Sequence, residues 1–168
     1  MENQEYIGKV VSITGHRPDE FGGYEDNVIH SLVKESLAAA FHMVKPTKVI
    51  VGMALGVDQW AAEVCIKLGI PFEAAIPFLG QESIWPAPSK ERYFELLAKA
   101  ESKTIVCEGA YAPWKMQKRN EYMVNNSQLL VAVFDDTKEK GGTYNCVEYA
   151  KKAGKSILVI DPKLFQVK

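Results

Sequence analysis

Short apolar runs alternate with longer segments of helical periodicity along the whole chain. Six of the runs are rich in Val and Ile and are apolar at consecutive positions, which is typical of strands covered on both faces of a sheet. We expect these strands at residues 9–14, 48–51, 72–76, 103–107, 129–134 and 156–160.

The segments between the runs have the spacing of amphipathic helices. In 24–43, apolar residues recur at positions 28, 32, 33, 37 and 41, which lie on one helical face. Further helices are expected at 57–68, 90–100, 114–125 and 143–153, and Gly154 follows the last where a left-handed glycine often ends a helix.

Strict alternation of strands and helices predicts an α/β fold. Right-handed crossovers then give a Rossmann-like, doubly wound, mainly parallel six-stranded sheet with helices on both faces. No repeat or linker interrupts the pattern, so we expect residues 1–168 to form a single domain.

Composition indicates a soluble globular protein without broad electrostatic partners. The chain of 168 residues is 47% hydrophobic and 24% charged, with a net charge of −1. This balance disfavours general attraction to nucleic acid or to an anionic membrane. The apolar runs are too short for a bilayer, and the polar N-terminus lacks a signal-peptide core, so a cytoplasmic location is expected. A homo-oligomer is left open.

The cysteines do not form a ligand or disulfide pattern. Cys65, Cys107 and Cys146 are odd in number and widely spaced, and no CxxC or Cys/His cluster occurs. We therefore expect three buried free thiols, no disulfide, no metal site and no resident cofactor.

Residues suited to ligand binding follow several strands of the predicted sheet. In doubly wound sheets, ligands bind at the carboxyl ends of the strands, near the point where the strand order reverses. We expect one pocket there, formed by Gly15, His16, Arg17, Gly52, Ala54, Gly56, Asp58, Arg119, Asn120, Gly141, Gly142 and Thr143.

The stretch at Gly141, Gly142 and Thr143 suits a phosphate. It supplies open backbone N–H groups, a hydroxyl and the positive end of a helix. Arg17 and Arg119 can each give planar, bidentate hydrogen bonds to an anionic oxygen.

Several polar residues could have either a functional or a structural role. Asp58 could accept hydrogen bonds from a sugar, or it could serve as a favourable carboxylate in the first turn of a helix. His16 could act as an acid–base group, although packing or capping of a loop is favoured. His30 and His42 are expected to face solvent. Glu148 lies one turn inside the last helix, where a surface ion pair is the alternative to a catalytic role.

An irregular stretch, "WPAPSKERY", follows the third strand. Gln81, Trp85 and Tyr93 could form a lid or stack on a base. Loop packing is the alternative for these aromatic side chains beside the prolines.

Four motifs give the chain a family resemblance. "GHRP", "GMALGVDQWAAE", "RNEYMV" and "GGTYNCVEYA" occur in the order seen in the YpsA-like branch of the SLOG superfamily. The chain also resembles this branch in Pro77, Phe78, Gln81, Trp85 and Tyr93. The superfamily joins the DNA-processing protein A (Smf) group and the LONELY GUY phosphoribohydrolases, and the resemblance extends over about residues 10–160.

The resemblance implies a Rossmann-like SLOG fold that binds or senses a nucleotide or nucleotide-derived ligand, such as an ADP-ribose species. One alternative is LONELY GUY-like N-glycosidic hydrolysis of a nucleoside monophosphate, with Glu148 or Asp58 assisting. Another is single-stranded DNA binding, for which Lys115, Lys118 and Arg119 are the local basic residues. LONELY GUY enzymes carry PGGxGT and a glutamate three residues after the threonine, where this chain has Cys146. This departure weakens the hydrolase alternative.

Overall fold

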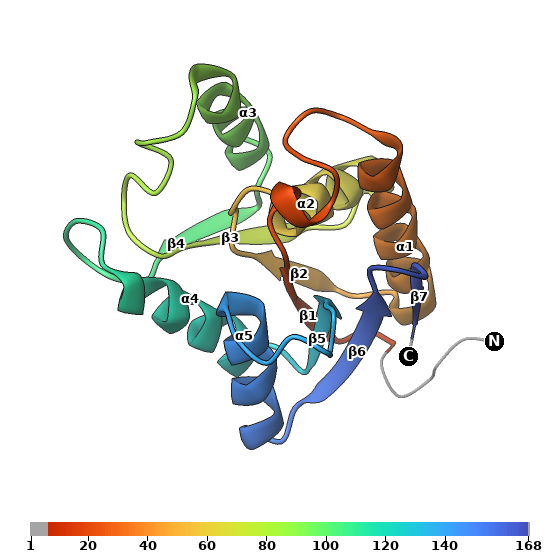
Figure 1. Cartoon of the computed structure of the whole chain (residues 1–168). Helices are drawn as coiled ribbons and strands as arrows, with labels where there is room; N and C mark the ends of the chain where they lie inside the picture. Colours follow the sequence, from red (N-terminus) through yellow and green to blue (C-terminus); the bar gives the residue numbers. More distant parts are fainter. Residues whose placement is uncertain (1–6, 168) are drawn as a thin grey trace.

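The computed structural model describes residues 7–167 and confirms the α/β, Rossmann-like fold (Figure 1). Seven strands form one sheet in the order β4-β3-β2-β1-β5-β6-β7. They are β1 (Val10–Gly15), β2 (Lys48–Val51), β3 (Phe72–Ile76), β4 (Ser102–Ile105), β5 (Leu129–Val133), β6 (Ser156–Asp161) and β7 (Gln166–Val167). All neighbouring strands pair in parallel except β6 and β7, which are antiparallel.

The strand order reverses between β1 and β5. β1 pairs with β2 on one side and with β5 on the other, with Gly15 opposite Val133. The carboxyl ends of β1 and β5 therefore lie side by side, although more than a hundred residues separate them along the chain. This is the position at which a doubly wound sheet binds its ligands.

Helices cover both faces of the sheet. α1 (Val28–Val44), α2 (Val57–Leu68) and α3 (Ala87–Leu97) pack in sequence beside one another, whereas α4 (Pro113–Asn125) packs against α5 (Gly142–Lys152) (Figure 1). A short 3-10 helix, η1 (Pro18–Glu20), lies between β1 and α1.

Helix boundaries follow local capping chemistry. α1 begins at Val28, four residues later than expected, because the side chain of Asn27 accepts hydrogen bonds from the N–H groups of Ile29 and His30 at 2.8 and 3.1 Å. α3 begins at Ala87, earlier than expected, because Pro86 is its N-cap and Pro88 lies in its first turn, where no N–H is needed.

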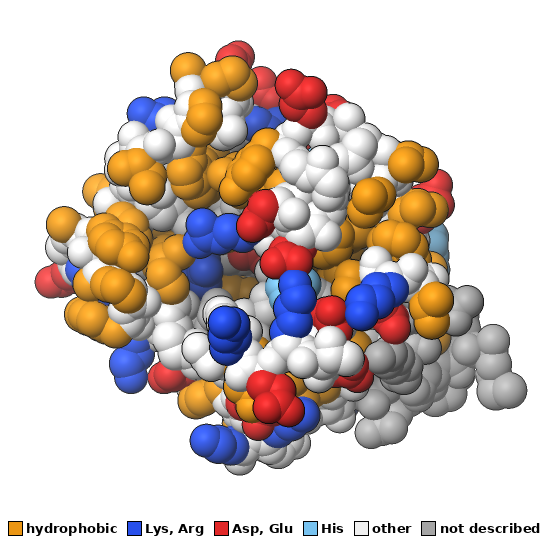
Figure 2. All heavy atoms as spheres, in the orientation of Figure 1, with side chains coloured by type: hydrophobic (Ala, Val, Ile, Leu, Met, Phe, Trp, Pro, Cys, Tyr) orange, Lys and Arg blue, Asp and Glu red, His pale blue; other side chains and the backbone are white. Residues whose placement is uncertain are grey.

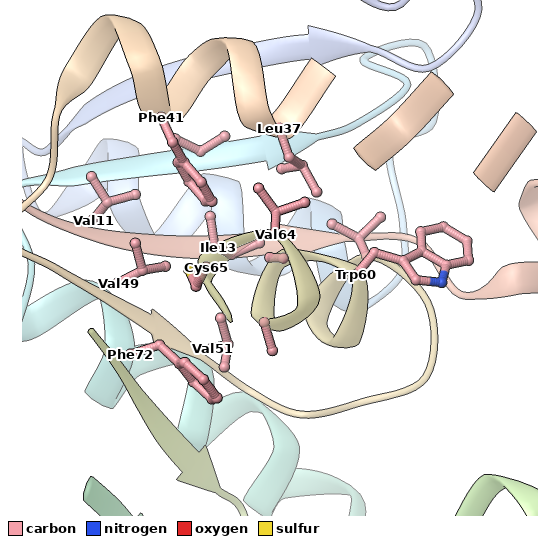
Figure 3. Packing of buried hydrophobic residues seen from close by; sticks show 14 of the residues in the cluster. Val11, Ile13, Leu37, Phe41, Val49, Val51, Trp60, Val64, Cys65 and Phe72 are labelled. Atoms are coloured by element: carbon pink, nitrogen blue, oxygen red, sulfur yellow. The ribbon is translucent and has the colours of Figure 1, made fainter. Parts of the chain in front are cut away.

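The largest core lies between the sheet and the layer of α1 and α2. Val11 and Ile13 from β1 pack there with Leu37 and Phe41 from α1 and with Cys65 from α2 (Figure 3). A second cluster, formed around Leu130, Ala132, Cys146 and Val147, fills the face under α4 and α5. Burial on both faces explains the continuous apolar pattern of the central strands.

The two edges of the sheet differ from the sequence prediction. β4 is mostly exposed, and its Ile105 keeps 43% of its surface accessible, because no further strand pairs with it. At the other edge, the two-residue strand β7 was missed, since so short a pairing leaves no periodic signal in the sequence.

Candidate functional site

A cavity of about 300 Å³ opens at the junction of β1 and β5. We call it the glycine-loop cavity. Of the predicted ligand-binding residues, those that line it are Gly15, His16, Arg17, Ala54, Asp58, Arg119, Asn120, Gly141, Gly142 and Thr143. They come from segments that follow four different strands, so their convergence results from the strand order and not from sequence proximity.

The glycine loop leaves open space in front of α5. Gly141 is the N-cap of α5 and has φ of 103°, a conformation that side-chain-bearing residues rarely adopt. A Cβ atom built at Gly141 or at Gly142 would meet no protein atom within 4 Å. Protein packing thus does not require glycine at position 142, whereas a ligand that approaches the backbone N–H groups would.

At three other predicted positions, close packing within the protein explains why the residue is glycine. A Cβ at Gly15 would lie 2.6 Å from the side chain of Val57, and one at Gly56 would lie 2.6 Å from the carbonyl oxygen of His16. A Cβ at Gly52 would lie 2.6 Å from Nη1 of Arg119. Gly52 and Gly56 do not line the glycine-loop cavity, so the expectation that they would do so is wrong.

Arg119 is held inside the protein and has little freedom to follow a ligand. Its Nη1 donates to the carbonyl oxygen of Gly52 at 2.5 Å, and its Nε donates to the side chain of Asn120 at 2.9 Å. The residue is 4% exposed, and burial lowers the pKa of its guanidinium, which the charge of Asp58 opposes. Arg119 therefore contributes fixed positive charge to the cavity wall.

Asp58 shares this buried environment. Its carboxylate accepts a hydrogen bond from the N–H of Ala54 at 3.3 Å, and a Cβ at Gly52 would lie 2.8 Å from its Oδ2. Burial raises the pKa of Asp58, while Arg119 and Arg17 oppose that shift. Asp58 closes the turn that precedes α2 and also lines the cavity, so both of its predicted readings remain open.

Arg17 and Lys140 supply the accessible positive charge. Both residues are exposed and line the glycine-loop cavity. Within residues 7–167, the guanidinium of Arg17 forms no hydrogen bond or ion pair with protein. Arg17 is therefore the arginine best placed to bind an anionic oxygen.

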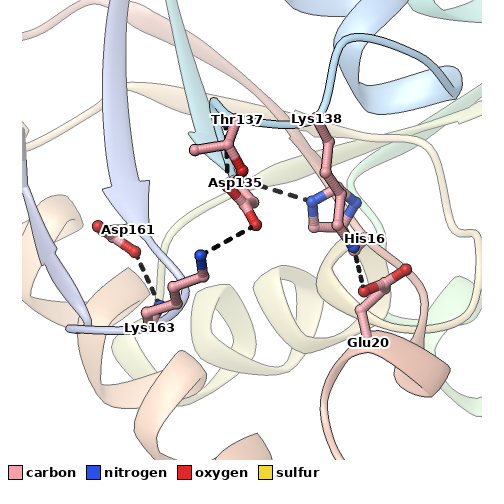
Figure 4. A network of polar contacts seen from close by, with 7 residues as sticks. All are labelled: His16, Glu20, Asp135, Thr137, Lys138, Asp161 and Lys163. Carbon is pink, nitrogen blue, oxygen red and sulfur yellow. Dashed lines mark hydrogen bonds and ion pairs between the residues drawn. The ribbon is translucent and has the colours of Figure 1, made fainter.

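His16 packs between two loops at the cavity wall (Figure 4). Its ring centroid lies 6.2 Å from those of Phe21 and Phe134, and its Nε2 accepts the backbone N–H of Asp135 at 3.4 Å. Burial is the main cause that lowers the pKa of His16 below its ordinary 6.5. These contacts favour the packing role.

An ion pair between Glu20 and Lys138, 2.5 Å long, links η1 to the loop that leads to α5 (Figure 4). Both side chains are largely exposed, so this pair contributes little stability. Its position matters more, because it joins the segments that follow β1 and β5.

Glu148 lies away from the cavity. It does not line the cavity, and its carboxylate forms an ion pair with Lys151 at 3.2 Å along the surface of α5. The surface reading of Glu148 is thus the one that the geometry favours. His30, expected to face solvent, is instead 3% exposed and packs against Trp60, with ring centroids 4.3 Å apart and an interplanar angle of 38°.

A second cavity, of about 410 Å³, adjoins the first. We call it the aromatic cavity, since Phe78, Trp85 and Tyr111 line it together with Gln81 and Ile84. Tyr93, which was expected at a lid or stacking position, is 2% exposed and packs against Trp85 in the core. Tyr93 thus supports the wall of the aromatic cavity from behind.

Sequence reasoning missed several lining residues of the glycine-loop cavity, namely Thr14, Asp19, Glu20, Leu55, Met116 and Lys140. A signal existed for two of them. Met116 lies three and four residues before Arg119 and Asn120, on the same face of α4. Lys140 directly precedes the glycine loop.

The cysteines are free thiols, but they differ in exposure. Burial raises the pKa of Cys65 to about 12 and that of Cys146 to about 11. Cys107 is only partly buried, contrary to expectation, because β4 lies at the sheet edge. Among the described residues, no group of three or more His, Cys, Asp or Glu side chains could hold a metal ion. Within 7–167 there is no helix with the length and apolar character needed to cross a membrane.

Solved structures resemble this chain in fold. DNA processing protein A from Helicobacter pylori, whose structure concerns its single-stranded DNA binding mode, aligns with a TM-score of 0.66 and 17% identity over 95% of this chain and 69% of its own. The chain spans about half of the corresponding protein from Streptococcus pneumoniae, at 51% coverage and a TM-score of 0.63. The molybdenum cofactor carrier protein from Chlamydomonas reinhardtii has a TM-score of 0.54 and 15% identity over 90% of this chain and 75% of its own.

Relatives found by sequence share a higher identity with this chain than these solved structures do. The SPbeta prophage-derived protein YoqJ from Bacillus subtilis is 40% identical over 119 residues, which is 61% of this chain and 68% of that protein. The model of the YpsA family, described as "YspA SLOG family", matches residues 11–164. The chain therefore belongs to the YpsA family of SLOG proteins.

Proposed function

We propose that this protein binds or senses a nucleotide or nucleotide-derived small ligand, such as an ADP-ribose species, in the glycine-loop cavity. The observation that carries the proposal is the unfilled space at Gly141 and Gly142, at the N-terminus of an eleven-residue helix. Phosphate oxygens there would accept hydrogen bonds from backbone N–H groups and from the hydroxyl of Thr143.

The accessible cations support the same assignment. Arg17 and Lys140 line the cavity from two different loops, so together they can neutralise a phosphate held at α5. A hydrogen bond to a charged group contributes about 1.5–3 kcal/mol, compared with about 0.3–1 kcal/mol for an exposed helix terminus. Arg17 should accordingly contribute more to affinity than the helix dipole.

N-glycosidic hydrolysis of a nucleoside monophosphate is the second candidate function. Asp58 favours it, because this carboxyl group lines the cavity and burial raises its pKa, as a general acid requires. The position of Glu148 outside the cavity argues against a direct LONELY GUY-like mechanism. Release of free base from AMP would support the enzyme, and binding without turnover would support the sensing module.

Single-stranded DNA binding has less support in the site. The acidic side chains of Asp19, Glu20 and Asp58 share the cavity with the basic ones. Lys115, one of the local basic candidates, is 6% exposed and donates to the carbonyl oxygens of Glu108 and Ala110. Its charge is therefore occupied in holding a loop.

A glycine substitution tests the phosphate site directly. Gly142→Val should fold normally, because no protein atom lies within 4 Å of an added Cβ, but its side chain would fill the space in front of α5. We expect the variant to lose binding of ADP-ribose and AMP in calorimetric titrations. Asn145→Val, at an exposed position of the same helix outside the cavity, is the matched control and should bind like the wild type.

Arg17→Ala should weaken binding about 10- to 100-fold. With ligand at about 100 times its dissociation constant, the wild type should gain about 2.7 kcal/mol of stability, or about 5–10 °C in Tm. If Gly142→Val and Arg17→Ala both keep the full thermal shift, the glycine loop is only a helix entry and the proposal is wrong.

A further inference from the structure

The aromatic cavity is continuous with the glycine-loop cavity. Arg17, Ala54 and Met116 line both. A ligand anchored by a phosphate at α5 could therefore extend past Arg17 into the second space. The volume of about 410 Å³ is large enough for a planar heterocycle.

The walls of this cavity present aromatic faces. The rings of Phe78 and Tyr111 meet edge to face, with centroids 5.8 Å apart, and Trp85 lines the same space. Tyr111 is 66% exposed and Ile84 is 91% exposed, so apolar surface remains uncovered at the mouth. Figure 2 shows hydrophobic side chains gathered on this side of the molecule, over the start of α4 and the loop before it. Aromatic surface of this kind binds nucleobases by stacking.

Gln81 forms part of the wall of this cavity. It is 6% exposed, and its Nε2 donates to the carbonyl oxygen of Gly52 at 3.3 Å. Its Oε1 atom is enclosed by protein, so no group of a ligand in the cavity can reach that oxygen. Gln81 therefore fixes the shape of the wall and does not contact the ligand.

We infer that the aromatic cavity is a nucleobase subsite, in which the planar base of the ligand stacks on the ring of Tyr111. This inference rests on the proposed function, since it places the phosphate of the same ligand at Gly141–Thr143. The ligand class is thus a nucleoside phosphate with an intact base.

Two probes separate the parts of this ligand. AMP carries phosphate, ribose and a base, whereas ribose 5-phosphate lacks the base. We expect AMP to bind about 5- to 100-fold more tightly than ribose 5-phosphate.

Matched variants assign the effects to residues. Tyr111→Ala should weaken AMP binding about 5- to 100-fold and leave ribose 5-phosphate unchanged. Trp114→Ala, at a 58% exposed aromatic position outside the cavity, is its control.

The outcomes distinguish the inference from the function on which it rests. Equal affinity for AMP and ribose 5-phosphate would overturn the base subsite and leave the phosphate site standing. No measurable binding of either probe would overturn both proposals together.

Discussion

The close approach of α2 to the end of β1 predicts that Gly15→Ala destabilises the protein. The new Cβ would lie 2.6 Å from three side-chain carbons of Val57, where ordinary contacts lie at 3.4–4 Å. Val57 is fully buried, and a β-branched side chain in a helix has one strongly preferred rotamer, so it cannot move aside easily.

Two opposing contributions determine how much Gly15→Ala changes the free energy of unfolding. Overpacking a core costs about 1–3 kcal/mol, while replacing glycine by alanine returns about 0.4–1 kcal/mol through the unfolded chain. We expect a net loss of about 1–2 kcal/mol in the free energy of unfolding. For a chain of this length, that is a fall in Tm of about 2–8 °C. Urea unfolding followed by tryptophan fluorescence measures the loss, with an unchanged m value.

Two further variants make this test specific. Gly142→Ala adds the same methyl group where no atom lies within 4 Å, so it should unfold within about 0.5 kcal/mol of the wild type. Gly15→Ala combined with Val57→Gly, which removes all three contacting carbons, should cost at least about 0.5 kcal/mol less than the sum of the single variants. A Gly15→Ala protein as stable as the wild type, or strictly additive losses, would refute the packing argument.

Other consequences can be measured independently. The ring of His16 should titrate by NMR below pH 6.5, and a titration midpoint at or above 6.5 would contradict the lowered pKa. The contribution of His16 to stability is present above pH 6.5 and is lost as pH falls through the lowered folded-state pKa. In the native protein, a thiol reagent should modify Cys107 first, and rapid modification of Cys65 or Cys146 without unfolding would disprove their burial. Phe41→Ala should lower the unfolding free energy by about 3–5 kcal/mol, and a loss below 1 kcal/mol would exclude Phe41 from the core.

The sequence carries a strong signal for the central elements of the fold and a weak one for the margins. β2, β3 and α2 begin and end where predicted, because continuous burial and helical spacing both leave clear patterns. The sequence does not show that Asn27 caps α1, since a capping residue is recognised only when the next N–H groups are placed. It also does not show η1 or β7, which are too short for periodicity.

The features of the site also divide into those that the sequence predicts and those that only the structure shows. Residues with ligand chemistry could be placed at the carboxyl edge of the sheet because parallel strands all end there, and most of these residues line one cavity. Whether a glycine serves packing or a ligand depends on neighbours distant in sequence, such as Arg119 beside Gly52. The burial of His30 against Trp60 and the enclosure of Gln81 in the cavity wall likewise depend on tertiary contacts.

The pairing of β1 with β5 has a consequence for synthesis on the ribosome. Val11 lies opposite Leu129, so the edge of β1 has no partner until more than two thirds of the chain has been made. A nascent half-sheet of β1 to β4 would expose that edge, which is an aggregation risk and a natural binding surface for a chaperone. The glycine loop at Gly141, where we propose that a phosphate binds, emerges later still. Ligand could therefore stabilise only the finished domain, and would act on the last step of folding and not on its nucleus.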